Sequence, residues 1–182
     1  NDELSEALKS ATQEEATGII LDLRNNPGGL LDSVVDVTSR FLEEGVVILY
    51  VVDNQRNRTS LLVDPDGVTT ILPMIVLVNE YTASASEVLS GALQDHDRAT
   101  IAGVRTYGKG SVNALYRLKD GSGLYITTAR WLTPDGRLIE GEGISPDYEL
   151  ELEGEEAVQW AVDCLKDNKC GRTNLGRGQK DG

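Results

Sequence analysis

GIILDLRNNPGGLL, residues 18–31, is the stretch of this chain that indicates its fold class. Its short apolar run, residues 19–23, is typical of a buried strand, and the Asn-Asn-Pro-Gly-Gly run after it is a dense turn signal. From Leu30 to Glu43, apolar residues recur at helical spacing. A strand, a turn and a helix are therefore expected in succession, which is the repeating order of an α/β fold.

A second stretch repeats this order between Pro73 and Asp95. Residues 73–79 form another apolar run, and good helix formers follow from Ala83 onward. Around these two units we expect helices at residues 2–16 and 155–166, strands at 46–52, 100–103, 114–118, 124–128 and 130–133, and a hairpin made by 61–63 and 68–72. The prediction is one α/β domain over residues 1–167, with additional short antiparallel strands, and a flexible tail at 168–182.

The acidic composition excludes several classes of partner. The 182 residues include 17 Lys and Arg against 30 Asp and Glu, which gives a formal net charge of -13. Such a surface repels phosphate backbones, so we expect no DNA or RNA partner. No apolar run reaches the roughly 18 residues of a membrane span, and the N-terminus lacks the pattern of a signal peptide. Because the sequence starts without Met, we interpret it as a processed product or an excised fragment.

Histidine and cysteine are too scarce for a zinc-type metal site. The chain has one histidine, His96, and two cysteines, Cys164 and Cys170. We therefore expect no metal, and no motif indicates another cofactor. The two cysteines lie six residues apart, which leaves open a small disulfide or, as the favoured interpretation, two free thiols.

Ser84 has two interpretations. With Glu87 it forms a capping-box pattern, and on this tetrapeptide alone capping of a helix is favoured. A serine nucleophile also suits a helix start after a strand, so the deciding question is which group takes its proton. His96 is excluded, because twelve residues of helix place it roughly 18 Å away. Lys109, flanked by two glycines, is the candidate base, although a glycine-rich loop with an exposed lysine is the commoner case.

The segment that ends at Lys109 also matches most of a phosphate-binding loop, with Gly103 and Gly108 at the required spacing. Gly110 stands where that loop needs Ser or Thr for Mg²⁺, and residues 112–116 have a strand pattern where the loop needs a helix. Nucleotide binding is therefore a disfavoured alternative.

Seven segments, in order along the chain, resemble the C-terminal processing peptidases, also called tail-specific proteases. They are residues 21–29, 76–79, 83–87, 91–95 with 98–99, 108–112, 127–130 with 133–134, and 143–147. Members of this family are serine endopeptidases with a Ser–Lys dyad. The resemblance spans about residues 18–150 and implies a crotonase/ClpP-like α/β core of repeated strand-strand-helix units.

The resemblance also implies a role for individual residues. Ser84 is the nucleophile that forms an acyl-enzyme, and Lys109 is the general base. The oxyanion hole is formed by the backbone N–H groups of Gly28, Gly29 and Ala85. Asp95 matches an acidic position with a supporting or structural role. Asn113 stands where many members have a Gln that orients the lysine, and its side chain is one methylene shorter.

Members of the family usually carry a PDZ domain and a further N-terminal portion of the catalytic domain before the matching region. We therefore interpret the chain as the C-terminal part of a longer, ATP-independent serine protease whose substrates are proteins with accessible C-termini. The resemblance implies an extracytoplasmic location, in the bacterial envelope, secreted, or in the thylakoid lumen of a phototroph. The alternative is a catalytically incompetent fragment or a non-catalytic binding or assembly module with the same fold.

Overall fold

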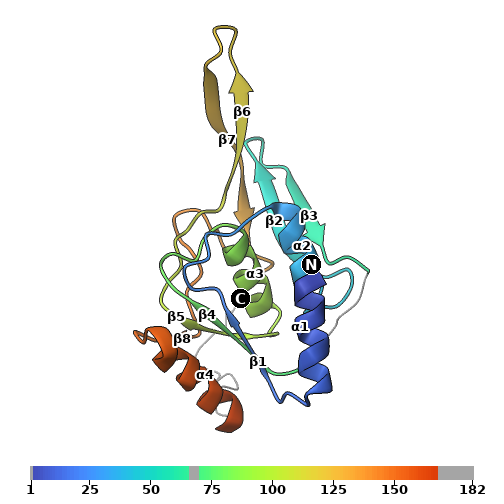
Figure 1. Cartoon of the computed structure of the whole chain (residues 1–182). Helices are drawn as coiled ribbons and strands as arrows, with labels where there is room; N and C mark the ends of the chain where they lie inside the picture. Colours follow the sequence, from blue (N-terminus) through green and yellow to red (C-terminus); the bar gives the residue numbers. More distant parts are fainter. Residues whose placement is uncertain (1, 66–69, 168–182) are drawn as a thin grey trace, which may run out of the picture.

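The computed structural model describes residues 2–65 and 70–167, which form four helices and two four-stranded sheets (Figure 1). The helices are α1 (Asp2–Gln13), α2 (Leu31–Thr38), α3 (Ala85–Asp95) and α4 (Gly154–Asp167). The strands are β1 (Ile19–Asp22), β2 (Val47–Asp53), β3 (Arg58–Leu62), β4 (Met74–Val78), β5 (Thr100–Gly103), β6 (Ser111–Arg117), β7 (Gly123–Leu132) and β8 (Tyr148–Glu149). The predicted mixed α/β class is confirmed.

The first sheet is parallel and has the strand order β1-β4-β5-β8. Its central strand β4 is buried on both faces, which explains why its sequence is a continuous apolar run. Met74, Val76 and Val78 belong to a core shared with α3, whereas Ile75 and Leu77 belong to a second core shared with α4. The two helices therefore cover opposite faces of this sheet, and the carboxyl ends of β1 and β4 lie at one edge of it.

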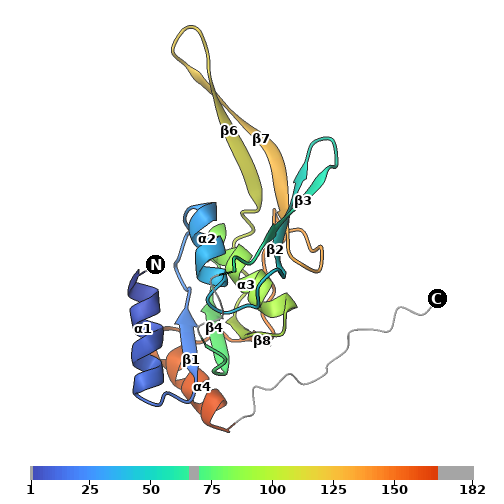
Figure 2. The ribbon, with the colours of Figure 1, turned by 90° about the vertical axis from the view of Figure 1, so that its right-hand side faces the viewer.

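The second sheet is antiparallel and has the order β3-β2-β7-β6. Beyond its contact with β2, the β6–β7 ribbon projects away from the rest of the molecule (Figure 2). The outer part of this ribbon is exposed, and Leu115 and Tyr125 are among its large exposed side chains. The predicted antiparallel strands are thus present, although they form a complete second sheet.

The predicted hairpin between residues 61–63 and 68–72 is wrong. The chain turns earlier, because the Asp53 carboxylate accepts the N–H groups of Gln55 and Asn57, each at 2.8 Å, and Arg56 has a left-handed φ of 68°. β3 consequently starts at Arg58 and pairs with β2. Residues 70–72 form no strand, and residues 66–69 lie outside the described residues.

Several predicted boundaries differ from the observed ones. α2 is shorter than residues 30–43, because the hydroxyls of Thr38 and Ser39 bond back to the Val34 and Val35 carbonyls at its end. The two strands predicted at 124–128 and 130–133 are one strand, β7, and the two-residue β8 was not predicted. The tail predicted at 168–182 lies outside the described residues.

Candidate active site

Two turns meet beside the carboxyl ends of β1 and β4. The Asn25 N–H donates to Asn79 Oδ1 at 2.9 Å, and Asn79 Nδ2 donates back to Asn25 Oδ1 at 3.0 Å. Asn25 has a left-handed φ of 58°, a conformation that asparagine adopts more readily than most residues do. This reciprocal pair fixes the turn that leads to Gly28 against the turn that leads to Ser84.

Thr82 joins the same two turns to a third segment. Its buried hydroxyl donates to the Leu23 carbonyl at 2.8 Å and accepts the Asn79 N–H at 2.9 Å. Its own carbonyl accepts the Tyr107 N–H at 3.0 Å. The segments that follow β1, β4 and β5 are therefore held together by one residue, through its hydroxyl and its backbone carbonyl.

Ser84 is the N-cap of α3 and has a backbone conformation that is rare for a residue with a side chain, with φ 57° and ψ −121°. Such strained conformations cost about 1–3 kcal/mol and are concentrated at functional sites. Glu87 Oε2 accepts the Ser84 N–H at 2.9 Å. Ser84 thus takes the helix-start position that its pattern predicts, in a geometry that capping alone does not require.

Gly28 packs directly against the Ser84 turn. Its φ is +87°, and a Cβ on Gly28 would lie 2.6 Å from the Ala83 oxygen and 2.7 Å from the Ala85 nitrogen. The neighbouring Gly29 has open space where a Cβ would stand. The close approach therefore requires glycine at position 28 and leaves position 29 sterically free.

The backbone donors proposed for an oxyanion differ in their availability. The Gly28 N–H donates to the Asn26 side-chain oxygen at 3.0 Å and is already engaged. Ala85 is the first residue of α3, where an N–H has no partner within the helix. Gly29 is exposed. Within the described residues, no acceptor is found for the N–H of Ala85 or Gly29.

Glu87 is the centre of this arrangement. Its side chain is fully buried, and it accepts four hydrogen bonds. Oε1 accepts from the Thr106 hydroxyl at 2.5 Å and the Gly108 N–H at 2.6 Å, while Oε2 accepts from the N–H groups of Ser84 at 2.9 Å and Lys109 at 2.8 Å. Four donors of this kind offset the cost of burying a carboxylate.

The shared oxygen brings the two candidate catalytic residues together. The backbone nitrogens of Ser84 and Lys109 both bond Glu87 Oε2, so their separation is at most about 5.7 Å, the sum of the two distances. The two residues are 25 positions apart in sequence, and the fold makes them neighbours. Lys109 is exposed among the described residues.

Both glycines that flank Lys109 pack closely against the segment at residues 139–141, and Gly108 also has a left-handed φ of 88°. A Cβ on Gly108 would lie 3.1–3.2 Å from the backbone of Gly141. A Cβ on Gly110 would lie 2.5 Å from the Glu140 nitrogen and 2.7 Å from the Ile139 Cβ. The backbone therefore approaches residues 139–141 closely on both sides of the lysine.

Asp95 lies at the opposite end of α3 from Ser84. Its carboxylate accepts the Asp135 N–H at 2.8 Å and pairs with Arg137, which fixes the turn between β7 and the segment after it. His96 follows as the C-cap and is half-buried, with its ring bonded to the Val47 carbonyl at 2.7 Å. The length of α3 separates it from Ser84, as the sequence predicts.

Asn113 has both amide atoms engaged within the second sheet. Nδ2 donates to Ser111 Oγ at 3.3 Å, and Oδ1 accepts the Thr127 hydroxyl at 2.7 Å. The structure does not place this side chain against Lys109 by any hydrogen bond among the described residues. Its predicted orienting role stays a prediction.

The phosphate-binding alternative does not fit the geometry. The residues after Lys109 form strand β6, where a phosphate loop requires a helix. The N–H groups of Gly108, Lys109 and Gly110 also donate to side-chain carboxylates, at 2.6, 2.8 and 2.7 Å. They are not available to a phosphate.

The comparisons with known proteins agree with this arrangement. Residues 1–150 match Peptidase family S41. The chain belongs to this peptidase family. It is 44% identical over 149 residues to a carboxyl-terminal-processing protease of Synechocystis sp., covering 82% of this chain and 34% of that protein. A probable CtpA-like serine protease of Staphylococcus aureus is 40% identical over 151 residues, covering 82% of this chain and 30% of that protein.

Solved S41-type structures show the same fold. A photosystem II D1 C-terminal processing protease superposes with a TM-score of 0.76 and 41% identity, covering 81% of this chain and 38% of that one. A mature CPAF structure superposes with a TM-score of 0.77 at 16% identity, covering 92% and 48%, which shows likeness of fold alone. The chain spans about a third of the length of the curated relatives it matches.

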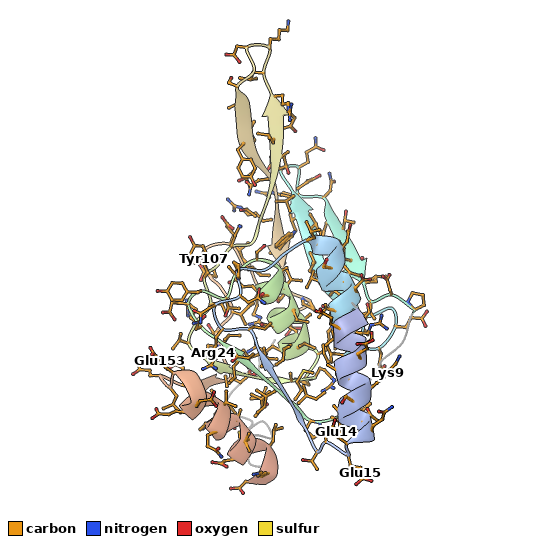
Figure 3. All side chains as sticks on the ribbon, viewed as in Figure 1. Lys9, Glu14, Glu15, Arg24, Tyr107 and Glu153 are labelled. Atoms are coloured by element: carbon orange, nitrogen blue, oxygen red, sulfur yellow. The ribbon has the colours of Figure 1, made fainter. Side chains whose placement is uncertain are left out.

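A cleft of about 540 Å³ opens beside the candidate site, along the carboxyl ends of β1, β4 and β5. Its lining includes Asp22, Arg24 and Glu153, and the latter two are labelled on one side of the molecule in Figure 3. Arg24 forms an ion pair with Asp22 and donates to the Gly154 carbonyl at 3.0 Å. Its hydrogen bond holds the pKa of the Asp22 carboxyl below its ordinary value.

Sequence reasoning missed three residues that organise the site. Thr82 and Thr106 were not singled out, and Glu140, whose Oε2 accepts the Gly110 N–H at 2.7 Å, gave no local signal. Glu87 was interpreted as a capping residue only. A polar residue that is buried through contacts far away in sequence has no local pattern that reveals it.

Cysteine, metal and membrane features complete the description. Cys164 is disulfide-bonded, so the favoured free-thiol interpretation of this residue is wrong, and Cys170 lies outside the described residues. Over residues 2–65 and 70–167, no group of three His, Cys, Asp or Glu side chains is arranged to hold a metal ion. In the same part of the chain, no helix has the length and apolar character needed to cross a bilayer.

Proposed function

We propose that this chain carries the nucleophile and the general base of a serine endopeptidase that cleaves proteins near their C-terminal tails. The observation that supports it best is the shared acceptor, Glu87 Oε2, which holds the backbone of Ser84 beside that of Lys109. The strained conformation of Ser84 adds support, because proteins retain such strain chiefly where function needs it. The relatives named as C-terminal processing proteases supply the substrate class.

The proposed reaction is acyl transfer through Ser84. Neutral Lys109 Nζ takes the hydroxyl proton as Ser84 Oγ bonds to the scissile carbonyl carbon. The N–H groups of Gly29 and Ala85 bind the oxyanion of the tetrahedral intermediate. The lysine ammonium then gives its proton to the departing amine, which leaves an ester on Ser84. Water, deprotonated by the same lysine, hydrolyses the ester and restores the serine.

The exposure of Lys109 adds a requirement to this mechanism. A lysine acts as a base only when it is neutral, and contact with water favours its charged form. We assign the exclusion of water to the bound substrate and to protein segments beyond this chain, which spans about a third of its curated relatives. A PDZ domain in the parent protein and an extracytoplasmic location belong to the same proposal, as does the crotonase/ClpP-like description of the fold.

The exposed lysine is also the observation that favours the alternative function. If no substrate or neighbouring segment covers Lys109, the chain is a catalytically incompetent fragment or a non-catalytic binding module. The intact arrangement around Glu87 favours the enzyme, because a binding module has no need for a strained serine beside a lysine.

The experiment that tests the proposal measures cleavage of an unstructured protein tail by the full-length gene product and its variants. Ser84→Ala should abolish cleavage and labelling by a fluorophosphonate while leaving the fold intact, since loss of a cap costs about 1 kcal/mol. Lys109→Ala and Lys109→Arg should also be inactive, because a guanidinium remains protonated. His96→Gln is the matched control and should cleave normally. Activity that survives in Lys109→Arg, or disappears in His96→Gln, would contradict the Ser–Lys assignment.

A further inference from the structure

Residues 139–144 pack along residues 106–110, which carry Lys109 and are called the lysine segment below. The Gly141 N–H donates to the Gly108 carbonyl at 2.8 Å, and the Ile144 N–H donates to Thr106 Oγ1 at 2.7 Å. Gly143 approaches the Thr106 carbonyl so closely that a Cβ there would overlap it. The two segments are thus in contact from one end of the lysine segment to the other.

Three successive N–H groups of the lysine segment donate to carboxylates. Those of Gly108 and Lys109 donate to Glu87 of α3, and that of Gly110 donates to Glu140 Oε2 at 2.7 Å. The Gly110 carbonyl in turn accepts the Trp131 N–H of β7 at 2.7 Å. Glu87 therefore holds the backbone at Gly108 and Lys109, and Glu140 holds it at Gly110.

We propose that Glu140 is a positioning residue for Lys109, a role that rests on the proposed peptidase function. Glu87 fixes the backbone on the N-terminal side of the Lys109 Cα, but among the described residues it accepts no hydrogen bond from a residue after Lys109. Without the bond from the Gly110 N–H to Glu140, the peptide plane between Lys109 and Gly110 has no hydrogen bond of its own on the Gly110 side within the described part of the chain, and the next contact is the Gly110 carbonyl, which accepts the Trp131 N–H. Rotation of this plane carries Nζ away from Ser84. The bond from Gly110 to Glu140 removes this freedom, and a displacement of 1 Å at a reacting group costs about 100-fold in rate.

The number of accepted bonds distinguishes the two carboxylates. Among the described residues, Glu140 accepts one hydrogen bond, at Oε2, and a glutamine carbonyl accepts one N–H equally well. Glu87 uses both oxygens for four donors, and a glutamine there turns an NH₂ group toward two of them. Glutamine should therefore substitute for glutamate at position 140 and fail at position 87.

The test compares steady-state cleavage of one peptide by the full-length wild-type protein and five variants. Glu140→Ala should lower kcat about 10- to 100-fold with KM within twofold of the wild type. Glu140→Asp, which keeps the charge but shortens the side chain, should lose a similar factor. Glu140→Gln should restore most of kcat, and Glu87→Gln should not. Glu142→Ala, an exposed glutamate in the same segment, is the matched control and should match the wild type.

Two results would overturn the role of Glu140: a wild-type kcat in Glu140→Ala and Glu140→Asp, or a loss in Glu140→Gln as large as in Glu140→Ala. If Glu140→Ala folds poorly, the Gln and Asp pair, with the exchange rate of the Gly110 amide proton, decides the question. Failure of the underlying function is recognised separately, because cleavage would then persist in Ser84→Ala. Loss of cleavage in Ser84→Ala, together with an unchanged Glu140 series, refutes the positioning role alone.

Discussion

Replacing Gly28 by alanine tests whether the turn after β1 sets the position of the nucleophile. The new methyl would lie 2.6 Å from the Ala83 oxygen, whereas real Cβ contacts stay above 3.0 Å and ordinary ones begin at 3.4 Å. The Gly28 turn and the Ser84 turn must therefore separate by about 0.4–0.8 Å, the difference between these distances. A displacement of that size at the reacting oxygen should lower the acylation rate about 10- to 100-fold.

The effect on stability should be smaller than the effect on rate. A left-handed conformation costs an alanine about 1–2 kcal/mol, which corresponds to a Tm decrease of roughly 2–8 °C for a chain of this size. The assay is the rate of Ser84 labelling by a fluorophosphonate, measured beside a thermal melt. Gly29→Ala is the matched control, because a Cβ there meets no atom within 4 Å. A folded Gly28→Ala protein that labels as fast as the wild type would refute this account of the site.

Three other changes test separate parts of the structure. Gly29→Pro removes a proposed oxyanion donor and should lower turnover roughly 100- to 1000-fold, with KM as the companion measurement; normal turnover would show that this N–H is not used. Thr82→Val should destabilise the fold by about 1–3 kcal/mol in urea titrations, since it removes the hydroxyl that donates to the Leu23 carbonyl and accepts the Asn79 N–H, and Thr82→Ser should recover most of that loss. Because Arg24 lowers the pKa of Asp22 in the folded state, the pair stabilises the fold above the ordinary value of 3.8 and loses this effect as pH falls through the folded pKa. Asp22→Asn should accordingly lower Tm at pH 6, and this decrease should become smaller as the pH falls below 3.8; a decrease that stays the same over this range would argue against it.

The sequence was sufficient to predict the parts of the fold that depend on neighbouring residues. The buried strand β4 and the helix after Ser84 have strong local patterns, and both are present at nearly the predicted positions. The hairpin was misplaced because the Asp-Pro-Asp-Gly sequence at residues 64–67 has a high turn propensity. The turn at residues 53–57 instead depends on hydrogen bonds to the Asp53 side chain, which propensity does not predict. Turn propensities describe the backbone preferences of each residue type, whereas this turn is stabilised by the carboxylate of one side chain.

The candidate site also contains residues that the sequence predicts and residues that it does not. Ser84 and Lys109 were chosen from the sequence by elimination and by resemblance, and the structure places their backbones on one oxygen of Glu87. The function of that carboxylate was not predictable, because its donors at Thr106 and Gly108 are 19 and 21 residues away. The exposure of Lys109 was also not predictable, since a glycine-flanked lysine has the same local sequence whether its side chain is buried or exposed.

The hydrogen bonds that assemble the candidate site determine when it can form during the life of the chain. They join residues separated by 54, 59 and 22 positions, so no short piece of the polypeptide contains the site. Contacts over such separations form late in folding, after the intervening loops have closed. A chain that is still unfolded, on the ribosome or elsewhere, therefore has a serine and a lysine but no shared carboxylate between them. The candidate site appears only when the chain has folded.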